Sequence, residues 1–480
     1  MSFKQKIYLF SAFLFVVVAY FSQGFNQFDE HTQVLEFGAY KLGMVEEKNL
    51  SWEFASQMRP AIQPLMVFCT HKLVAVFGVE SPFTIAFILR LFTAFISFIS
   101  IHLLIKAFYN DIKGENLKKS FILLSFFLWF GVFHSVRFSS ENMAGRIFVI
   151  AFALFFIWKD KAAKHYFAMG ILLGFSFLFR YQNAFMIVGW MAWLLFINKS
   201  KINELLLSVL GILLVFVFGI LIDRWFYGEW VLSTWKYFEE NILLNKAAGF
   251  GVHPWYTYFV EIFNVGIPPF SLVFILPLIL LSVFRWKEAL VWTVVPFFLV
   301  HCYIGHKELR FLYPALGLLP LMIVRSGEWF NEKWPALFQS KVSKILVLIF
   351  WIQNTIFLFI ISFKNADAEV GLFEKVYNDY TMPTKMYYVR YNPYFRGMPV
   401  YYYRRNNFKL DSISSLHEIN LSKDTVVLFA TQDKNDQAIL EKNNAVVYSA
   451  FPEWVKHFNV AGWVDRTRFW KVYELKNIPK

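Results

Sequence analysis

Three cationic or potentially cationic side chains stand close together in the segment HKELRFLYP. His306 and Arg310 are four residues apart with Lys307 beside them, and an apolar run follows at once. If the segment begins as a helix, His306 and Arg310 share one face of it. Arginine and lysine bind phosphate oxygens, and the apolar run can receive a hydrocarbon chain. The pattern favours a site for a lipid-linked phosphate over basic side chains that only reach towards the membrane surface.

An acidic pair, Asp29 and Glu30, directly follows the first apolar segment of the chain. Leu35, Ala39 and Leu42 then recur at helical spacing, which predicts an amphipathic helix lying in the membrane surface. Asp29 can act as the N-cap of that helix, where Asp is a preferred residue, and the spacing alone favours this role. It can also act as a general base held against the outer leaflet.

Two short segments place charged residues beside aromatic ones or at a predicted helix end. LSWEFASQMRP holds Trp52, Glu53 and Arg59, which suit a sugar-binding platform, although Trp is also common in the interfacial belt. RFSSENMAGR holds Arg137, Glu141 and Asn142, which can be no more than helix-capping groups and side chains that reach towards the membrane surface.

The segment 223–265 is rich in both aromatic and polar residues. One or two aromatic side chains would be an ordinary interfacial belt. So many of them, mixed with acidic, basic, amide and imidazole groups, predict a polar pocket at the membrane interface. The candidate substrate-binding residues in this segment are Asp223, Arg224, Tyr227, Asn241, His253 and Trp255.

The composition determines which elements can position these residues. The 480 residues are 57% hydrophobic and 17% charged, whereas a soluble domain has about 25% charged residues. The mean hydropathy is +0.45. Such a chain is a polytopic α-helical membrane protein rather than a soluble, disordered or disulfide-rich one. The two cysteines, Cys69 and Cys302, lie in apolar sequence and indicate neither a zinc site nor a redox site.

About eleven segments are apolar enough to cross a bilayer as helices. They cover roughly residues 7–25, 82–108, 120–136, 144–158, 166–180, 183–198, 204–222, 266–284, 289–305, 311–325 and 344–363. The basic clusters between them fall on one side of the membrane only if the ambiguous segment 61–80 does not cross. The N-terminus is then cytoplasmic and residues 364–480 lie on the other side. Basic cytoplasmic loops also account for the net charge of +13 without nucleic acid.

Two domains are predicted: a transmembrane domain of residues 1–363, with a first non-cytoplasmic loop at 26–81, and a small soluble α/β domain of residues 364–480. The strand-like runs in the second are Asp424–Ala430, Asn443–Ala450 and Arg466–Leu475. The candidate residues all lie in non-cytoplasmic loops, which predicts chemistry at the membrane surface. A transporter would instead place its ionisable groups at mid-membrane. Motifs of NTPases, dehydrogenases, zincins and metal-bound sugar nucleotides are absent from the sequence.

At these motifs the sequence resembles the polyprenyl (dolichyl)-phosphate-mannose-dependent mannosyltransferases of the GT-C fold. That family includes GPI mannosyltransferase 3 and the α-1,2 and α-1,6 mannosyltransferases of lipid-linked oligosaccharide assembly. The resemblance covers roughly residues 20–325 and is carried by Asp29-Glu30, SWEF-x4-RP, DRWFYG, N-x9-GVHPWYTY from Asn241, and HKELRFLYP. The chain departs from the family pattern at Leu309, where a second acid is usual, and at Phe54, where Trp is commoner.

The resemblance implies a membrane glycosyltransferase that moves mannose, or a related hexose, from a polyprenyl-phosphate donor to a glycan or glycolipid hydroxyl. The transfer is inverting and takes place on the non-cytoplasmic face. The resemblance implies Asp29 as the base, with Glu30 beside it, and His306, Lys307 and Arg310 as the groups that neutralise the departing phosphate. The scheme requires no metal and no other cofactor. The expected partners are the lipid-linked donor, the acceptor and the bilayer, and no nucleic acid.

Two other functions stay open at this point. A lipid-linked-sugar flippase or exporter would need ionisable groups deep in the spans, where the sequence has few, among them Arg90, Arg146 and Arg180. A GT-C transferase of a different sugar is the second. The heavy use of Phe, Lys and Asn favours an AT-rich bacterium, hence an inner-membrane protein with a periplasmic active site. In a eukaryote the equivalent place is the ER membrane.

Overall fold

Most of the chain up to residue 363 is helical, since in lipid a helix satisfies each backbone N–H and C=O group internally. The computed structural model describes residues 3–476 apart from 396, 422, 423, 443, 452, 453, 455, 456, 460, 461, 463, 465, 466 and 468. The chain divides into two units. Residues 1–22, 52–66 and 87–364 form the first unit, and residues 23–51, 67–86 and 365–480 form the second. Residues 23–51 and 67–86 therefore group with the C-terminal residues. A division of the chain at a single boundary, 363/364, leaves these two stretches in the first unit.

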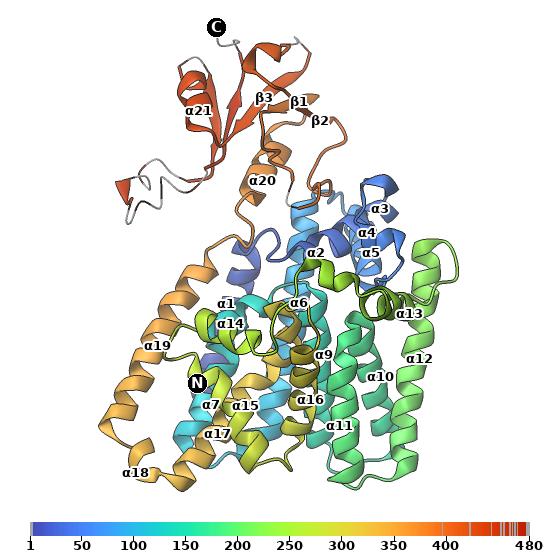
Figure 1. Cartoon of the computed structure of the whole chain (residues 1–480), viewed down its shortest axis with the longest axis vertical. Helices are drawn as coiled ribbons and strands as arrows, with labels where there is room; N and C mark the ends of the chain where they lie inside the picture. The colour runs from blue at the N-terminus through green and yellow to red at the C-terminus, as the bar shows by residue number, and fades with distance from the viewer. Residues whose placement is uncertain are drawn as a thin grey trace. The chain divides into compact units, whose positions relative to one another are not determined.

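The long helices of the first unit form a bundle (Figure 1). The helices of the first unit in the first half of the chain are α1 (Phe3–Phe21), α4 (Trp52–Ala55), α6 (Pro82–Phe108, from Phe87 on), α7 (Glu115–Phe127), α8 (Trp129–Ser135), α9 (Ser140–Ile157), α10 (Ala163–Phe179), α11 (Ala184–Phe196) and α12 (Ile202–Tyr227). Helix α5 (Ile62–Ala75) is divided between the two units, and its residues from Val67 on belong to the second. Those that follow are α13 (Ser233–Phe238), α14 (Thr257–Val265), α15 (Leu272–Phe284), α16 (Ala289–Tyr303), α17 (Leu319–Lys333), α18 (Pro335–Phe338) and α19 (Lys341–Ser362).

Each of the eleven predicted spans overlaps one of these helices or a bent pair of them. Within the described residues, six helices are long and apolar enough to cross a membrane, or seven if α7 and α8, bent by 48°, form one broken span. Helices α10, α15 and α16 are apolar but shorter. The membrane character is confirmed, and the count of eleven stays a prediction. Helix α5, within the ambiguous segment 61–80, has 14 residues, fewer than the about 20 that a span needs.

Helices α10 and α12 run side by side with their backbones almost in contact (Figure 1). A Cβ atom added at Gly170 would lie 2.1 Å from the carbonyl oxygen of Ser208, and one added at Gly211 would lie 2.6 Å from that of Phe167. The Ser208 hydroxyl also donates to the carbonyl of Tyr166 at 2.9 Å. Small residues at such a crossing let two helices pack closely where lipid offers no hydrophobic driving force.

An ion-pair network joins three loops that were predicted to share the cytoplasmic side. The backbone N–H of Lys113 donates to Glu328 at 2.7 Å, and its ammonium lies 3.1 Å from Glu332. Arg285 lies 3.5 Å from Glu328 and 3.3 Å from Glu332. The loops before α7 and after α15 therefore meet α17 at one end of the bundle, as the distribution of basic residues requires.

The second unit contains the first-loop helices and a small sheet. Its helical elements are α2 (Phe28–Glu30), the π-helix η1 (His31–Glu36), α3 (Phe37–Lys41), α20 (Val370–Asp379) and α21 (Lys434–Leu440). Its strands are β1 (Thr384–Tyr388), β2 (Phe408–Ser412), β3 (Val426–Thr431), β4 (Ala445–Ser449) and β5 (Lys471–Glu474). The strand order is β2-β1-β3-β5-β4, with β1 parallel to β2 and β3, and β5 antiparallel to β3 and β4.

The expected α/β character of the C-terminal segment is confirmed by this sheet. The three strand-like runs correspond to β3, β4 and β5, although residues 443, 466 and 468 of those runs lie outside the described residues. Strands β1 and β2 were not singled out from the sequence, because neither run is continuously apolar.

Candidate active site

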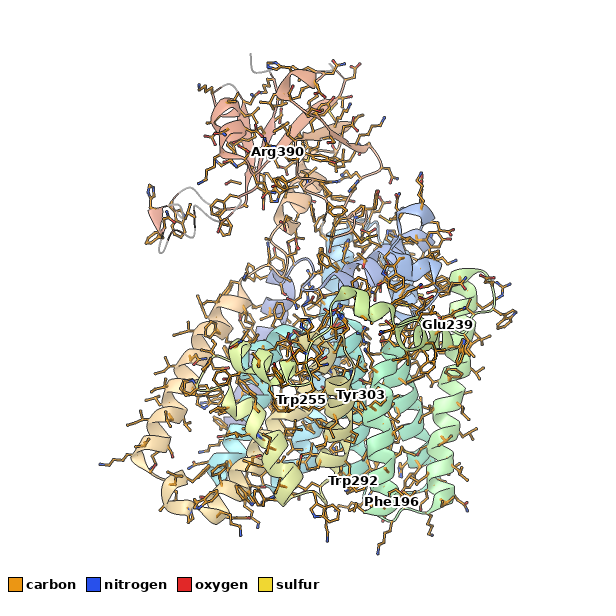
Figure 2. The ribbon with its side chains drawn as sticks, viewed as in Figure 1. Phe196, Glu239, Trp255, Trp292, Tyr303 and Arg390 are labelled. Atoms are coloured by element: carbon orange, nitrogen blue, oxygen red, sulfur yellow. The ribbon has the colours of Figure 1, made fainter. Side chains whose placement is uncertain are left out.

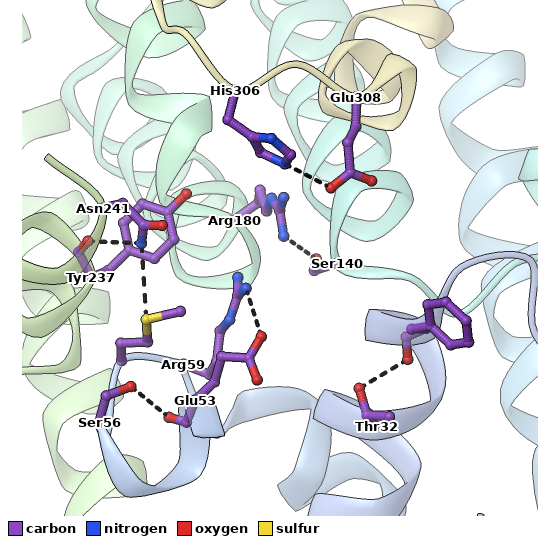
Figure 3. Close-up of polar contacts among 12 residues, drawn as sticks. Thr32, Glu53, Ser56, Arg59, Ser140, Arg180, Tyr237, Asn241, His306 and Glu308 are labelled. Carbon is purple, nitrogen blue, oxygen red and sulfur yellow. Dashed lines mark hydrogen bonds and ion pairs between the residues drawn. The ribbon is translucent and has the colours of Figure 1, made fainter. Parts of the chain in front are cut away.

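The segment after α16 carries the three predicted phosphate-binding residues. It has no helical turn before the 3-10 helix η7 (Leu309–Leu318), so the condition for placing His306 and Arg310 on one helical face is not met. The two residues meet instead at the carboxylate of Glu308. His306 Nε2 lies 3.1 Å from Glu308 Oε1 (Figure 3). Arg310 Nη2 donates to the same oxygen at 2.8 Å. The sequence analysis grouped these two residues because they would share one face of a helix, and this part of the chain is not helical.

Both ring nitrogens of His306 face acceptors. Nδ1 lies 3.0 Å from the carbonyl oxygen of Gly251, while Nε2 faces the Glu308 carboxylate. The two contacts hold the imidazole ring between the backbone of Gly251 and the side chain of Glu308. The segment around Gly251 thereby joins the phosphate-binding candidates, and the backbone N–H of His253 donates to the carbonyl of Gly305 at 2.9 Å.

Lys307 is oriented differently from its two neighbours. Its side chain is buried, and its ammonium donates to the carbonyl oxygen of Ile304. In the part of the chain that the structure describes, no acidic side chain forms an ion pair with it. Burial consequently lowers the pKa of Lys307 below the usual lysine range. A desolvated ammonium of this kind gains more from an incoming anion than an exposed one.

A second buried ion pair, whose pairing the sequence did not predict, lies close to Arg310. Arg180, just after α10, contacts Glu141 in the first turn of α9 at 3.2 Å, and both side chains are at most 6% exposed. Arg180 also donates to Ser140 at 3.3 Å (Figure 3). The guanidinium groups of Arg180 and Arg310 lie 5.6 and 5.5 Å from the same ring, that of Phe311. In the sequence, Arg180 and Glu141 stand out only because each lies at the end of an apolar segment. At such a position helix capping was the simpler interpretation.

The structure brings Glu53, Arg59 and Tyr227 together, and their role in substrate binding stays a prediction. Arg59 lies 3.7 Å from Glu53, and its guanidinium lies 5.7 Å from the ring centre of Tyr237 (Figure 3). The Tyr227 hydroxyl donates to the carbonyl of Arg59 at 2.8 Å. Asn241 lies beside them and donates to the carbonyl of Tyr237 at 3.0 Å. This group presents a carboxylate, a guanidinium and an aromatic ring in one place.

Asp223 holds the chain together at this point. One of its oxygens accepts the backbone N–H of Ala61 at 2.9 Å, and the other accepts the hydroxyl of Ser233. The Tyr181 hydroxyl lies 2.5 Å from that of Ser233. Burial raises the pKa of Tyr181, so its hydroxyl keeps its proton and can donate. The carboxylate thereby anchors the starts of α5 and α13, and its prediction as a substrate ligand gains no support from these contacts.

Exposed aromatic side chains occur at both ends of the helix bundle. Trp255 is 64% and Tyr303, the last residue of α16, is 90% exposed. Phe196, the last residue of α11, is 63% exposed and lies near the half-buried Trp292, which is close to the start of α16 (Figure 2). Two levels of amphipathic rings are typical of the two interfaces of a membrane. Trp255 therefore fits the interfacial belt as well as it fits a sugar platform. The other candidates with ring contacts are Trp52, stacked on Phe250 at 6.3 Å, and Arg224, 5.8 Å from the ring of Trp230.

Asp29 and Glu30 belong to the second unit. The N-cap of α2 is Gln27, and Asp29 stands in the first turn, so the N-cap interpretation of Asp29 is wrong. Asp29 is half-buried, whereas Glu30 is buried and its Oε2 accepts the backbone N–H of Asn26 at 2.9 Å. The expected helix after the acidic pair is present and continues through η1 into α3. Its polar residues His31, Gln33 and Glu36 are buried, so the expectation that it lies on the surface is wrong.

The comparison with known families places these observations in context. The sequence pattern of the Alg9-like mannosyltransferase family matches residues 6–388. The chain belongs to the Alg9-like mannosyltransferase family. GPI mannosyltransferase 3 of Candida albicans is 26% identical over 337 residues, which are 69% of this chain and 66% of that protein. GPI alpha-1,2-mannosyltransferase 3 of Bos taurus is 25% identical over 331 residues, which are 67% of this chain and 59% of that protein.

This Alg9-like chain spans about two thirds or less of the length of those curated relatives. Among solved structures it is similar to ArnT from Cupriavidus metallidurans bound to undecaprenyl phosphate, with a TM-score of 0.54, 9% identity, and 99% and 98% of the two chains covered. That likeness shows the fold, which is GT-C. The resemblance and the fold class inferred from the sequence are confirmed, and the protein is an integral membrane protein.

The family match contains every candidate residue from Asp29 to Arg310 and ends within β1. Most of the C-terminal sheet of this Alg9-like chain therefore lies outside the matched region. Among the residues described, no three His, Cys, Asp or Glu side chains gather as they would to hold a metal ion.

Proposed function

We propose that this chain is a membrane mannosyltransferase that transfers mannose, or a related hexose, from a polyprenyl-phosphate donor to a hydroxyl of a glycan or glycolipid. The observation that carries the proposal is the group of His306, Arg310 and Arg180 within the region matched by the mannosyltransferase family. Two guanidinium groups on one aromatic ring, with an imidazole beside them, suit the phosphate of a lipid-linked sugar.

The donor phosphate is the group that these side chains can stabilise. As the bond between the anomeric carbon and the phosphate oxygen breaks, negative charge collects on the departing lipid phosphate. Arg310, His306 and Lys307 supply cationic donors for that charge, and a well-placed donor contributes about 3–4 kcal/mol in the transition state. ArnT from Cupriavidus metallidurans, which shares the fold, binds undecaprenyl phosphate, a lipid phosphate of the class that this reaction would release.

The acceptor hydroxyl needs a base and a surface that orients the sugar. Asp29 is half-buried rather than fully enclosed, and we assign it the proton of the attacking hydroxyl. The attack inverts the anomeric carbon, because lipid phosphate leaves from the opposite face. Glu30 then positions the acceptor. Glu53, Arg59 and Tyr227 form the sugar-binding group, with Trp52, Arg224, Asn241, His253 and Trp255 as its further members.

The arginines within the predicted spans do not favour a transport path. Arg90 donates to the carbonyl of Ala19 at 2.7 Å, and Arg146 donates to Ser135 at 2.9 Å and to Asn142 at 3.2 Å. These side chains satisfy protein acceptors rather than line an open route. We place the protein in a bacterial inner membrane with its active site in the periplasm, and the ER membrane is the equivalent place in a eukaryote.

A transfer assay on membranes that contain the expressed protein tests the proposal. Labelled mannose should pass from polyprenyl-phosphate-mannose to a lipid-extractable glycan, and GDP-mannose in the absence of polyprenyl phosphate should give no product. Membranes with the Asp29→Asn protein, inserted to the same level, serve as the control. If the protein transfers another sugar from its polyprenyl-phosphate form and does not transfer mannose, the donor sugar in the proposal is wrong and the reaction type is kept. If the protein transfers no sugar from any lipid-linked donor, the proposal is overturned.

A further inference from the structure

One buried carboxylate oxygen in the second unit receives three donors. Oε1 of Glu36 lies 2.7 Å from His31 Nε2, 2.6 Å from the backbone nitrogen of Tyr401 and 3.0 Å from that of Tyr402. The side chains of His31 and Glu36 are 1% and 5% exposed. A carboxylate removed from water to this extent is costly unless donors satisfy it, so the three contacts are mutually dependent.

An aromatic stack surrounds the same point. The imidazole of His31 stacks on Phe25 at 4.7 Å and on Tyr403 at 5.4 Å, with interplanar angles of 28° and 20°. Tyr403 stacks in turn on Phe83 at 4.6 Å. Rings from the first loop, the start of α6 and the segment after β1 therefore hold the imidazole plane in one orientation.

These contacts bear on the proposed base because of their place in the chain. His31 is two residues after Asp29, and Glu36 follows in the same continuous helical run. The turn between them is π-helical, a geometry found mostly as single turns and often at functional sites. Residues just before Asp29 are tied to the C-terminal segment as well, since Gln23 accepts the backbone N–H of Ala366 at 2.8 Å.

We propose that Glu36 and His31 are positioning residues that lock the helix of Asp29 onto the segment Tyr401–Tyr403. This segment lies beyond residue 388, where the family match ends, so the C-terminal segment supplies part of the geometry of the base. The proposal rests on the proposed function for the role of Asp29. It assigns the C-terminal segment a task in catalysis: without its two backbone N–H groups, Glu36 would keep a buried charge with too few donors to satisfy it.

Kinetics of two Glu36 variants test this role. Glu36→Ala removes the acceptor from all three donors and should lower kcat by about 10²-fold, as expected for a displaced catalytic group. The donor KM should stay within about twofold, because the donor-binding candidates belong to the first unit. Glu36→Gln keeps an oxygen for the two backbone N–H groups and should recover most of the lost kcat. Wild-type kcat in the Glu36→Ala protein would overturn the proposal.

A matched control separates positioning from general damage to the second unit. Glu441 is another carboxylate of this unit, and it accepts from Lys471 at 2.6 Å and from Tyr473 at 3.2 Å, both on β5. Glu441→Ala should destabilise the sheet. It should leave kcat unchanged when the amount of active protein is determined from donor binding. Equal losses of kcat in Glu36→Ala and Glu441→Ala would overturn the proposal, because the effect would then be structural.

A labelling experiment tests the lock without using activity. The exposed Cys69 is replaced by Ala, Asp29→Cys is introduced, and the rate of reaction with a membrane-impermeant thiol reagent is measured. Adding Glu36→Ala should raise that rate at least severalfold, and Glu441→Ala should not. Equal rates with and without Glu36→Ala would overturn the lock. If the native chain transfers no sugar, the proposed function fails while this experiment still decides the structural inference.

Discussion

Arg310 and Glu308 form a two-pronged ion pair in which Nη2 and Nε lie 2.8 Å from the two carboxylate oxygens. The same carboxylate contacts His306, so one acidic side chain aligns two of the cations that we assign to the donor phosphate. A planar guanidinium presents its donors as a rigid fork, which an ammonium cannot reproduce. Glu308 therefore fixes the orientation of the Arg310 guanidinium.

The fork predicts that Arg310→Lys is not a conservative change. We expect kcat/KM to fall about 10²-fold, because one oriented donor to the charged phosphate is lost while the charge is kept. If the contact tightens as the phosphate departs, kcat falls together with donor affinity. Steady-state kinetics with varied donor measure both constants. Arg285→Lys, in the ion-pair network at α17, is the matched control and should retain native kinetics.

Two outcomes would contradict the assignment of the cationic group. A change in donor KM alone would limit Arg310 to substrate binding. Native constants in both Arg310→Lys and His306→Ala would mean that neither side chain meets the donor phosphate.

Asp29→Asn should abolish most of the activity while preserving the fold. The change keeps the size of the side chain and removes the proton acceptor, and the loss of a general base typically costs 10²–10⁴-fold in rate, here about 10³-fold. Glu30→Gln should cost less, since the amide oxygen can still accept the backbone N–H of Asn26. Initial rates at saturating donor measure the effect. Native turnover by a correctly inserted Asp29→Asn protein would exclude it as the base.

Lys307 should make donor binding depend on pH. Its lowered pKa means that the folded protein loses this proton at a lower pH than an exposed lysine does. The donor KM should therefore rise as pH rises through that lowered pKa. Arginine keeps its charge, so Lys307→Arg should give a nearly constant KM from about pH 7 to about pH 10. The same pH profile in both proteins would assign the titration to another group.

The lowered pKa of Lys307 also makes the stability of the protein depend on pH. Raising the pH weakens donor binding but stabilises the folded protein. Between the lowered folded pKa and the ordinary unfolded pKa, the unfolded chain binds more protons at Lys307 than the folded protein. The free energy of unfolding therefore rises with pH in that window. Denaturation measured at several pH values in the native and Lys307→Arg proteins checks the sign.

Asp223→Ala should reduce stability more than it changes substrate affinity. The change leaves the backbone N–H of Ala61 and the Ser233 hydroxyl without their acceptor, at a cost of about 1–3 kcal/mol for a buried group. Thermal unfolding in detergent and the KM for the acceptor are both measured. Lys236→Ala is the control, because its ion pair with Glu239, at 2.9 Å, is partly exposed to solvent. A raised acceptor KM at native stability would restore Asp223 as a substrate ligand.

The predicted topology can be tested with single cysteines in a Cys69→Ala background. A cysteine at Lys113 should react only with a reagent that reaches the cytoplasm, and cysteines at Asn26 and Asn365 should react from the other side. Lys113 meets Glu328 and Glu332, so it shares its end of the bundle with α17. Labelling of the Lys113 and Asn26 positions from the same face would refute the eleven-span topology.

The sequence alone determined the membrane class, the helical segments and the local motifs. Burial in lipid depends on the hydropathy of each short stretch, so each of the eleven apolar segments predicted a helix that the structure contains. The group around His306 was also visible, because its members are within five residues of one another. Even there the helical geometry assumed for His306 and Arg310 was wrong. The backbone at Glu308, just before η7, is extended, and the Glu308 carboxylate contacts both side chains.

The tertiary structure decided which polar groups pair across the chain. Arg180 meets Glu141, Asp223 meets Ala61, and Glu36 meets Tyr401, each between segments that no local pattern links. The physical reason is that a buried charge must find a donor or an opposite charge wherever packing brings one near, and that partner depends on how whole helices and loops are placed. Hydropathy says that a side chain is buried, but only the packed chain determines the partner that stabilises it there.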